Sequence, residues 1–152
     1  MMNRLTRMLC TGSVALTILT ACGEPPSAPE EELRAWVAAG VEAAEKKERR
    51  GLVGMISESY ADSRGNERSD IENLLRIYFL RQNNITLLPN IDEVVVYGDT
   101  AATIVMTVGM AGTNDGVLGF SADAYRFELE LEKDGEWQLI AARWGEVGDE
   151  IK

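Results

Sequence analysis

The sequence predicts an α+β domain in which N-terminal helices cover one face of an antiparallel sheet. Two observations carry this prediction. Between about residues 30 and 83, apolar side chains recur at three- and four-residue spacing, which is typical of amphipathic helices. From residue 84 onward, runs of alternating apolar and polar residues are separated by glycine-containing turns, which indicates four strands joined mainly by hairpins. Helices must cover the apolar face of such a sheet, so a two-layer domain follows.

Two long helices and one undecided segment precede the strands. The first helix is expected over about residues 30–50, where Ser27 and Glu30 have the spacing of a capping box and Gly51 can end the helix. The short apolar run at 52–56 fits either a strand or a second short helix, and residues 57–68 are expected to form a loop. The next long helix is expected over about 70–83, with Ser69–Glu72 as its capping box and its apolar side, including Leu75, in the core.

Glycine and proline residues indicate where the four predicted strands turn or are interrupted. The first strand follows Asn84 and is interrupted at Pro89, where we expect a bulge or bend because proline cannot donate to the ladder. A two-residue turn at Gly98 and Asp99 leads into the second strand, and residues 111–119 form a glycine-rich loop. The third strand alternates over 120–132, and a turn at 134–135 leads into the last strand, over about 136–147.

Strict alternation assigns the faces of the last two strands. On the third strand it places Asp123, Tyr125 and Phe127 on the apolar face, with Phe127 in the core and Asp123 near the mouth. On the last strand it places Arg143 on that same face, where it can pair with Asp123. It leaves Trp144 on a second apolar face, which a homodimer or the chain's own terminus or loop would have to cover.

The first 21 residues have the pattern of a secretory signal peptide. Arg4 and Arg7 precede about 12 mostly apolar residues, a run too short to span a bilayer. The motif Leu-Thr-Ala-Cys that ends at Cys22 resembles the bacterial lipobox, and in proteins with that motif the cysteine thiol receives a diacylglycerol. Residues 22–29 would then be a lipidated cysteine and tether, and residues 30–152 the domain. Gly23 resembles the outer-membrane class, so we expect an envelope lipoprotein facing the periplasm.

Charge and residue usage exclude several classes of function. The formal net charge is −10, and −12 once Arg4 and Arg7 are removed, so the domain should repel nucleic acid. The chain has no histidine, which excludes histidine-based triads and metal sites. Cys10 would leave with the signal peptide and Cys22 would carry lipid, so we expect neither a disulfide nor a zinc-thiolate site. We therefore expect no metal and no cofactor.

The order of segments, ending in the run DGEWQLIAARW, is similar to the nuclear transport factor 2-like superfamily, which includes polyketide cyclases. The resemblance covers about residues 30–147, and Gly135 and Trp137 are its most recognisable pair. It implies a cone-shaped domain, with a strongly curved sheet wrapped around the helices. It also implies two kinds of function, because the superfamily contains exported lipoproteins as well as isomerases, dehydratases and cyclases that use the cone as a pocket. Fold alone does not choose between them.

The candidate binding residues are Tyr78, Asp123, Tyr125 and Arg143. Tyr78 lies on the apolar side of its helix, where its hydroxyl needs a hydrogen-bond partner. A carboxylate desolvated beside such phenols could act as a base of raised pKa, so Asp123, Asp62 and Tyr78 are the catalytic candidates. The alternative is that these polar groups only satisfy one another.

These observations favour a lipid-anchored, non-catalytic binding or accessory module of the cell envelope, able to hold a small apolar ligand. The alternative is a cofactor-free isomerase, dehydratase or cyclase with a carboxylate base in the cone. A cone filled with apolar side chains would favour the first function. An open pocket with a desolvated acid would favour the second.

Cys22→Ser tests the anchor. A lipidated cysteine carries more than one acyl chain, at about 0.8 kcal/mol per buried CH₂, which exceeds the marginal hold of a single myristoyl group. The serine variant should therefore move from the membrane pellet to the soluble periplasmic fraction. A serine variant that stays in the pellet after a high-salt wash would contradict the anchor.

Overall fold

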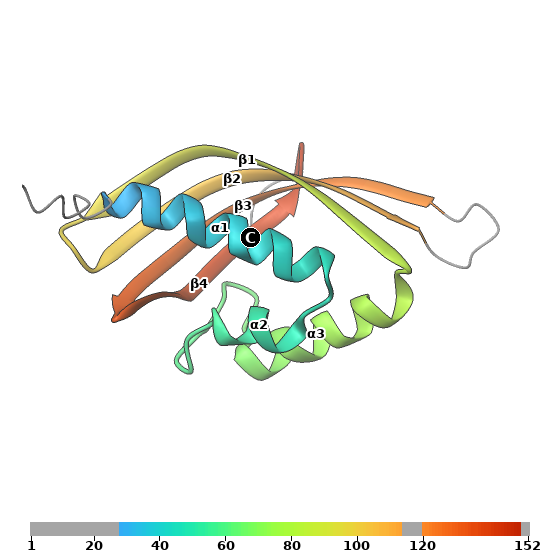
Figure 1. Ribbon diagram of the computed structural model, residues 1–152, viewed down its shortest axis with the longest axis horizontal. Helices are drawn as coiled ribbons and strands as arrows, with labels where there is room; N and C mark the ends of the chain where they lie inside the picture. Colours follow the sequence, from blue (N-terminus) through green and yellow to red (C-terminus); the bar gives the residue numbers. More distant parts are fainter. Residues whose placement is uncertain (1–27, 114–119, 150–152) are drawn as a thin grey trace, which may run out of the picture.

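The computed structural model describes residues 28–113 and 120–149 of the chain. Three helices come first: α1 (Pro29–Glu45), α2 (Arg49–Gly54) and α3 (Arg68–Arg81). Four strands follow: β1 (Asn84–Tyr97), β2 (Ala101–Thr113), β3 (Phe120–Asp134) and β4 (Glu136–Glu146). The strands form one antiparallel sheet in the order β1-β2-β3-β4, which arches over the helices (Figure 1). This confirms the predicted α+β architecture. The predicted signal peptide, Cys22 and Ser27 lie outside the described residues.

The prediction of a single helix over residues 30–50 is wrong, because α1 ends at Glu45 and a second helix begins at Arg49. Lys47 has a φ of 57°, a left-handed conformation that a continuous helix does not contain. Its ammonium group bonds to the carbonyl of Gln82, which ties the break to the end of α3. The undecided run at 52–56 therefore belongs mostly to a short second helix, and Ile56 adds only an isolated parallel bridge to β4.

Helix α3 begins earlier than expected and lies apart from the core. Its capping box uses Glu67 and Asp70 in place of Ser69 and Glu72, and the Glu67 backbone N–H donates to Asp70 Oδ2 at 3.0 Å. None of its residues is buried. Leu75 is only half-buried, so its expected place in the core is wrong.

The turns and bulges of the sheet differ in position from those expected. Pro89 stays within the ladder opposite Val108 on the edge strand β1, where a missing N–H can face outward, and the bulge falls at Asp92. The first hairpin has a three-residue loop over 98–100, entered through Gly98 at φ 62°. Strands β2 and β3 extend to residues 113 and 120, so the glycine-rich loop is shorter than expected.

A second bulge, in β4, changes which side chains face the helices. Leu131 pairs with Leu139 whereas Glu130 pairs with Ala141, so Ile140 is an extra residue. Because side chains alternate with a period of two, one extra residue reverses the faces of everything that follows. Arg143, opposite Glu128, therefore lies on the outer face, and its expected position on the apolar face is wrong.

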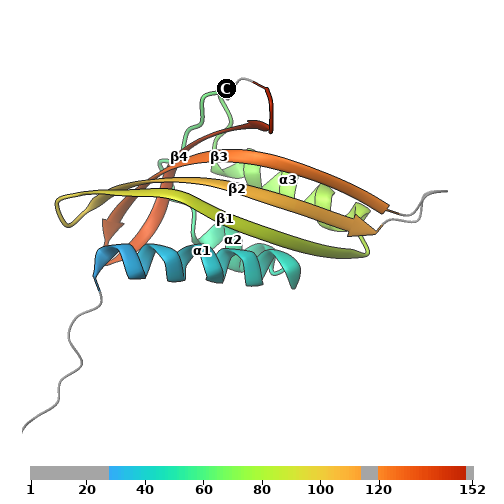
Figure 2. The ribbon, with the colours of Figure 1, turned by 90° about the horizontal axis from the view of Figure 1, so that it is seen from above.

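The core lies between α1 and the middle of the sheet, and Figure 2 shows α1 running alongside β1. Leu33 of α1, Ile104 of β2 and Leu131 of β3 are its fully buried side chains. Phe127, expected in the core, is half-buried and packs against its edge. The domain is therefore tightly packed around α1 and loosely covered on the side of α3.

We predict that Leu131→Ala lowers the free energy of unfolding by about 2–5 kcal/mol, as expected for a fully buried leucine. Leu75→Ala should cost clearly less, because that side chain borders a cavity and water already reaches it. Glu130→Ala, exposed on the outer face, should stay within about 0.5 kcal/mol. Urea melts of the three variants measure these differences, and equal losses for Leu131 and Leu75 would contradict this account of the core.

Candidate functional site

An apolar cavity lies between the helices and the concave face of the sheet. Its deep part has a volume of about 290 Å³ and is lined only by apolar residues of α1, α2, α3 and the four strands and by Met55 and Ile56 after α2. Its mouth has a volume of about 470 Å³ and opens between α3 and strands β2 to β4. The two parts adjoin, because four residues line both of them: Ile71, Leu75, Met110 and Phe127. These volumes fall in the range of small-molecule sites.

Two tyrosines line the mouth, and two carboxylates lie beside it on the concave face. Tyr78 from α3 and Tyr125 from β3 line it directly. The strand register pairs Asp123 with Met110 and Glu146 with Tyr125, which places both carboxylates on the concave face, as expected for Asp123. The Tyr125 hydroxyl lies 3.5 Å from Glu146 Oε1, a long hydrogen bond. The mouth is thus acidic and aromatic around an apolar interior.

Both phenols are held in the protonated form. Burial raises the pKa of Tyr78, and the negative charge of Asp123 adds to this shift. Burial likewise raises the pKa of Tyr125, followed by the charges of Glu146 and Asp123. At neutral pH the two tyrosines can therefore donate hydrogen bonds but cannot act as bases.

Asp62 lies away from the cavity and has a structural role. It is 9% exposed and accepts hydrogen bonds from the backbone N–H groups of Arg64 and Asn66, each at 2.8 Å, and from the Asn66 side chain. Burial alone would raise the pKa of Asp62, but the bonds from Asn66, Arg64 and Tyr60 outweigh it and lower the pKa. The expectation of a raised pKa is therefore wrong for this residue.

The bulge in β4 exchanges the roles expected for Arg143 and Trp144. Arg143 forms an ion pair with Glu128 on the outer face, so the expected pair with Asp123 does not form. Trp144 lines the cavity mouth, and the Arg64 guanidinium lies 4.6 Å from its ring centroid and donates to its carbonyl at 2.7 Å. The expectation that Trp144 faces outward, from which a homodimer was inferred, is wrong; the homodimer itself stays a prediction.

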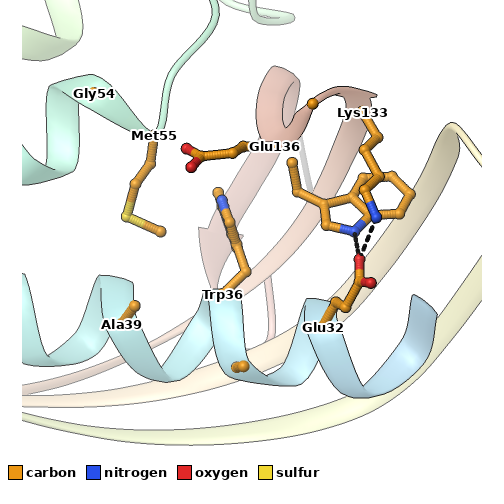
Figure 3. Close-up of a pocket in the computed structure, with 10 residues that line it drawn as sticks. Glu32, Trp36, Ala39, Gly54, Met55, Lys133 and Glu136 are labelled. Atoms are coloured by element: carbon orange, nitrogen blue, oxygen red, sulfur yellow. Dashed lines mark hydrogen bonds and ion pairs between the residues drawn. The ribbon is translucent and has the colours of Figure 1, made fainter. Parts of the chain in front are cut away.

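A second, shallower groove lies between α1, the end of α2 and the β3–β4 turn (Figure 3). Its volume is about 460 Å³. Glu32 accepts hydrogen bonds from the Lys133 ammonium and from Trp137 Nε1, the latter at 3.0 Å, so these charged groups already satisfy each other. Trp36 and Met55 line both this groove and the deep cavity and separate the two. The indole N–H of Trp36 has no hydrogen-bond partner among the described residues.

Two features are absent from the described residues. Across 28–113 and 120–149 no three cysteine, aspartate or glutamate side chains lie close enough to hold a metal ion. Within the same ranges no helix has the length and hydropathy needed to cross a membrane.

The cavity and the curved sheet define a cone-shaped α+β domain, and solved structures give its class. A candidate scytalone dehydratase from Novosphingobium aromaticivorans superposes with a TM-score of 0.71 at 10% identity, over 77% of this chain and 83% of that one. A candidate dehydratase of the nuclear transport factor 2-like family from Streptomyces avermitilis superposes with a TM-score of 0.66 at 11% identity, over 76% of this chain and 94% of that one. A nuclear transport factor 2-like superfamily protein from Salmonella enterica superposes with a TM-score of 0.65 at 15% identity, over 78% of this chain and 90% of that one.

The chain therefore has the nuclear transport factor 2-like fold. No protein-family model matches its sequence, and no curated protein does. At these identities the likeness is one of fold alone, so the function must be argued from the cavity.

Asp62→Asn tests the structural role of that carboxylate. We expect a loss of about 1–3 kcal/mol at pH 7, because the new amide cannot accept all the bonds that Asp62 accepts. The folded pKa lies below the unfolded value of about 3.9, so the contribution is present above that value and is lost as the pH falls through the folded pKa. The gap between variant and parent should therefore close in acid. Asp99→Asn, in an exposed turn, is the control, and a constant gap would contradict the assignment.

Proposed function

We propose that this protein is a lipid-anchored, periplasm-facing module that binds a small apolar ligand in its cone without transforming it. The observation that carries the proposal is the lining of the deep cavity, where every residue is apolar. Such a lining favours an apolar molecule through the area that it removes from water, and offers no group that would move a proton.

The position of the carboxylates supports binding over catalysis. A general base for enolisation needs burial or a like-charged neighbour to raise its pKa toward neutrality. Asp123 is exposed at the mouth, and Asp62 lies outside the cavity with a lowered pKa. Tyr78 and Tyr125 stay protonated. These groups can orient a ligand at the entrance, whereas the buried part of the ligand would meet an interior with no ionisable side chain.

The lipid anchor is the second part of the proposal and rests on the motif that ends at Cys22. Helix α1 begins at Pro29, so seven residues from 22 to 28 would join the lipid to the domain. Fully extended, they reach about 25 Å at roughly 3.5 Å each. The cavity would then stay near a membrane surface, where apolar molecules are concentrated. Gly23 supports the outer membrane as that surface.

A cavity-filling substitution tests the binding function. In Leu75→Trp the larger side chain occupies the space shared by the mouth and the deep cavity. Native mass spectrometry of protein purified without detergent from its own cells should detect a bound molecule in the parent and none in this variant. Leu80→Trp, on the same helix at a site that is 82% exposed, is the matched control and should keep the molecule. A parent whose cavity binds no apolar molecule under any condition would contradict the proposal.

The alternative, a cofactor-free isomerase or dehydratase, would depend on Asp123 beside Tyr78 at the mouth. It is supported only by the names of structural neighbours, two of which are candidate dehydratases. Mass spectrometry distinguishes the two functions. A binding module releases the same molecule that it takes up, whereas an enzyme releases an isomer or a product lighter by one water, and Asp123→Asn would abolish that change.

A further inference from the structure

The mouth of the cavity concentrates negative charge where a ligand's head group would lie. Asp123 and Tyr125 are neighbours on the concave face of β3, and Glu146 stands opposite Tyr125 on β4. Tyr78 reaches the same mouth from α3. The two phenols thus line the opening, and the two exposed carboxylates lie beside it on the same concave face, next to an interior lined by apolar residues.

Three arginines on the surrounding elements already have partners. Arg126 and Arg143 belong to the outer face of the sheet, where they pair with Asp92 and Glu128. Arg64 lies against Trp144 and donates to its carbonyl. The charges that act on the two phenols are those of Asp123 and Glu146.

We infer that the ligand is a cationic amphiphile, with an apolar body in the cavity and an amine or quaternary ammonium head between Asp123, Glu146 and the two tyrosines. This inference rests on the proposed binding function and names its ligand class. The carboxylates attract the positive head, and the negative faces of the tyrosine rings add a cation–π contribution. An anionic head would meet two negative charges, and a neutral head would gain only hydrogen bonds.

Three probes with the same ten-carbon chain separate the head group from the apolar body. Decyltrimethylammonium, 1-decanol and decyl sulfate are titrated by calorimetry into the protein purified without detergent, below micelle-forming concentrations. We expect all binding to be lost in Leu75→Trp, and the cation to bind about tenfold more tightly than the alcohol, with the sulfate weakest. A tenfold preference corresponds to about 1.4 kcal/mol, the size expected from two exposed charge contacts and one aromatic contact.

Charge-removing variants locate the effect. The double variant Asp123→Asn/Glu146→Gln should lose the preference for the cation and keep its affinity for 1-decanol. The pair Glu130→Gln/Glu132→Gln removes two charges from exposed positions of the same strand and should leave the preference intact. If this control loses the preference equally, the attraction is general and the head-group site is overturned.

The other outcomes separate this inference from the binding function on which it rests. Equal affinity for the three probes, or a preference for the alcohol or the sulfate, would overturn the cationic head while the cavity remained a binding site. Failure of all three probes to bind would overturn both. Preference for the cation that survives in Asp123→Asn/Glu146→Gln would place the head group elsewhere and overturn the assignment to these carboxylates.

Discussion

One extra residue in β4 decides which side chains face the cavity. Because Ile140 has no partner in the ladder, the residues after it change faces relative to those before it. Trp137 can therefore face α1 near the start of the strand, and Trp144 and Glu146 can face the cavity near its end. Without this bulge, Arg143 would project into the opening that Trp144 now lines, and its charge would offset those of Asp123 and Glu146.

The domain has a tightly packed side and a hollow side. Around α1, the strands bury Leu33, Ile104 and Leu131 completely. On the other side, a hollow lies between α3 and strands β2 to β4, and no residue of α3 is buried. Stability can thus be supplied by one region while the other keeps an open apolar surface, which a fully packed cone would not offer.

Periodicity alone predicted the elements and their order. Helical spacing located α3 to within about two residues, and alternation located β3, because each has a single face toward the interior. The break after Glu45 was missed because residues 45–50 are all charged, none of them is glycine or proline, and only the conformation of Lys47 reveals the break. Capping was misjudged at α3, since Glu67 can cap a helix although it is a less common capping residue than Ser69.

The candidate site was harder to predict than the fold for a related reason. Tyr78, Asp123 and Tyr125 precede any irregularity on their elements, so simple spacing placed the two tyrosines at the mouth and Asp123 on the concave face. Arg143, Trp144 and Glu146 follow the bulge, and nothing in the local sequence of β4 marks Ile140 as the extra residue. Asp62 was misjudged because its environment depends on backbone N–H groups that a turn brings together, which side-chain patterns do not report.

Where the carboxylates lie within the cone also bears on what this fold can do. A carboxylate at the bottom of an apolar cavity is desolvated, and its raised pKa suits proton transfer. The same group at the rim keeps its water and its charge, and it acts on a ligand through long-range attraction. Asp123 and Glu146 are both exposed rim residues, and the interior beneath them is hydrocarbon. Under the proposed function, a cone with this distribution would select a ligand by the charge at one end and the apolar area at the other, and would leave the chemistry of the buried part unchanged.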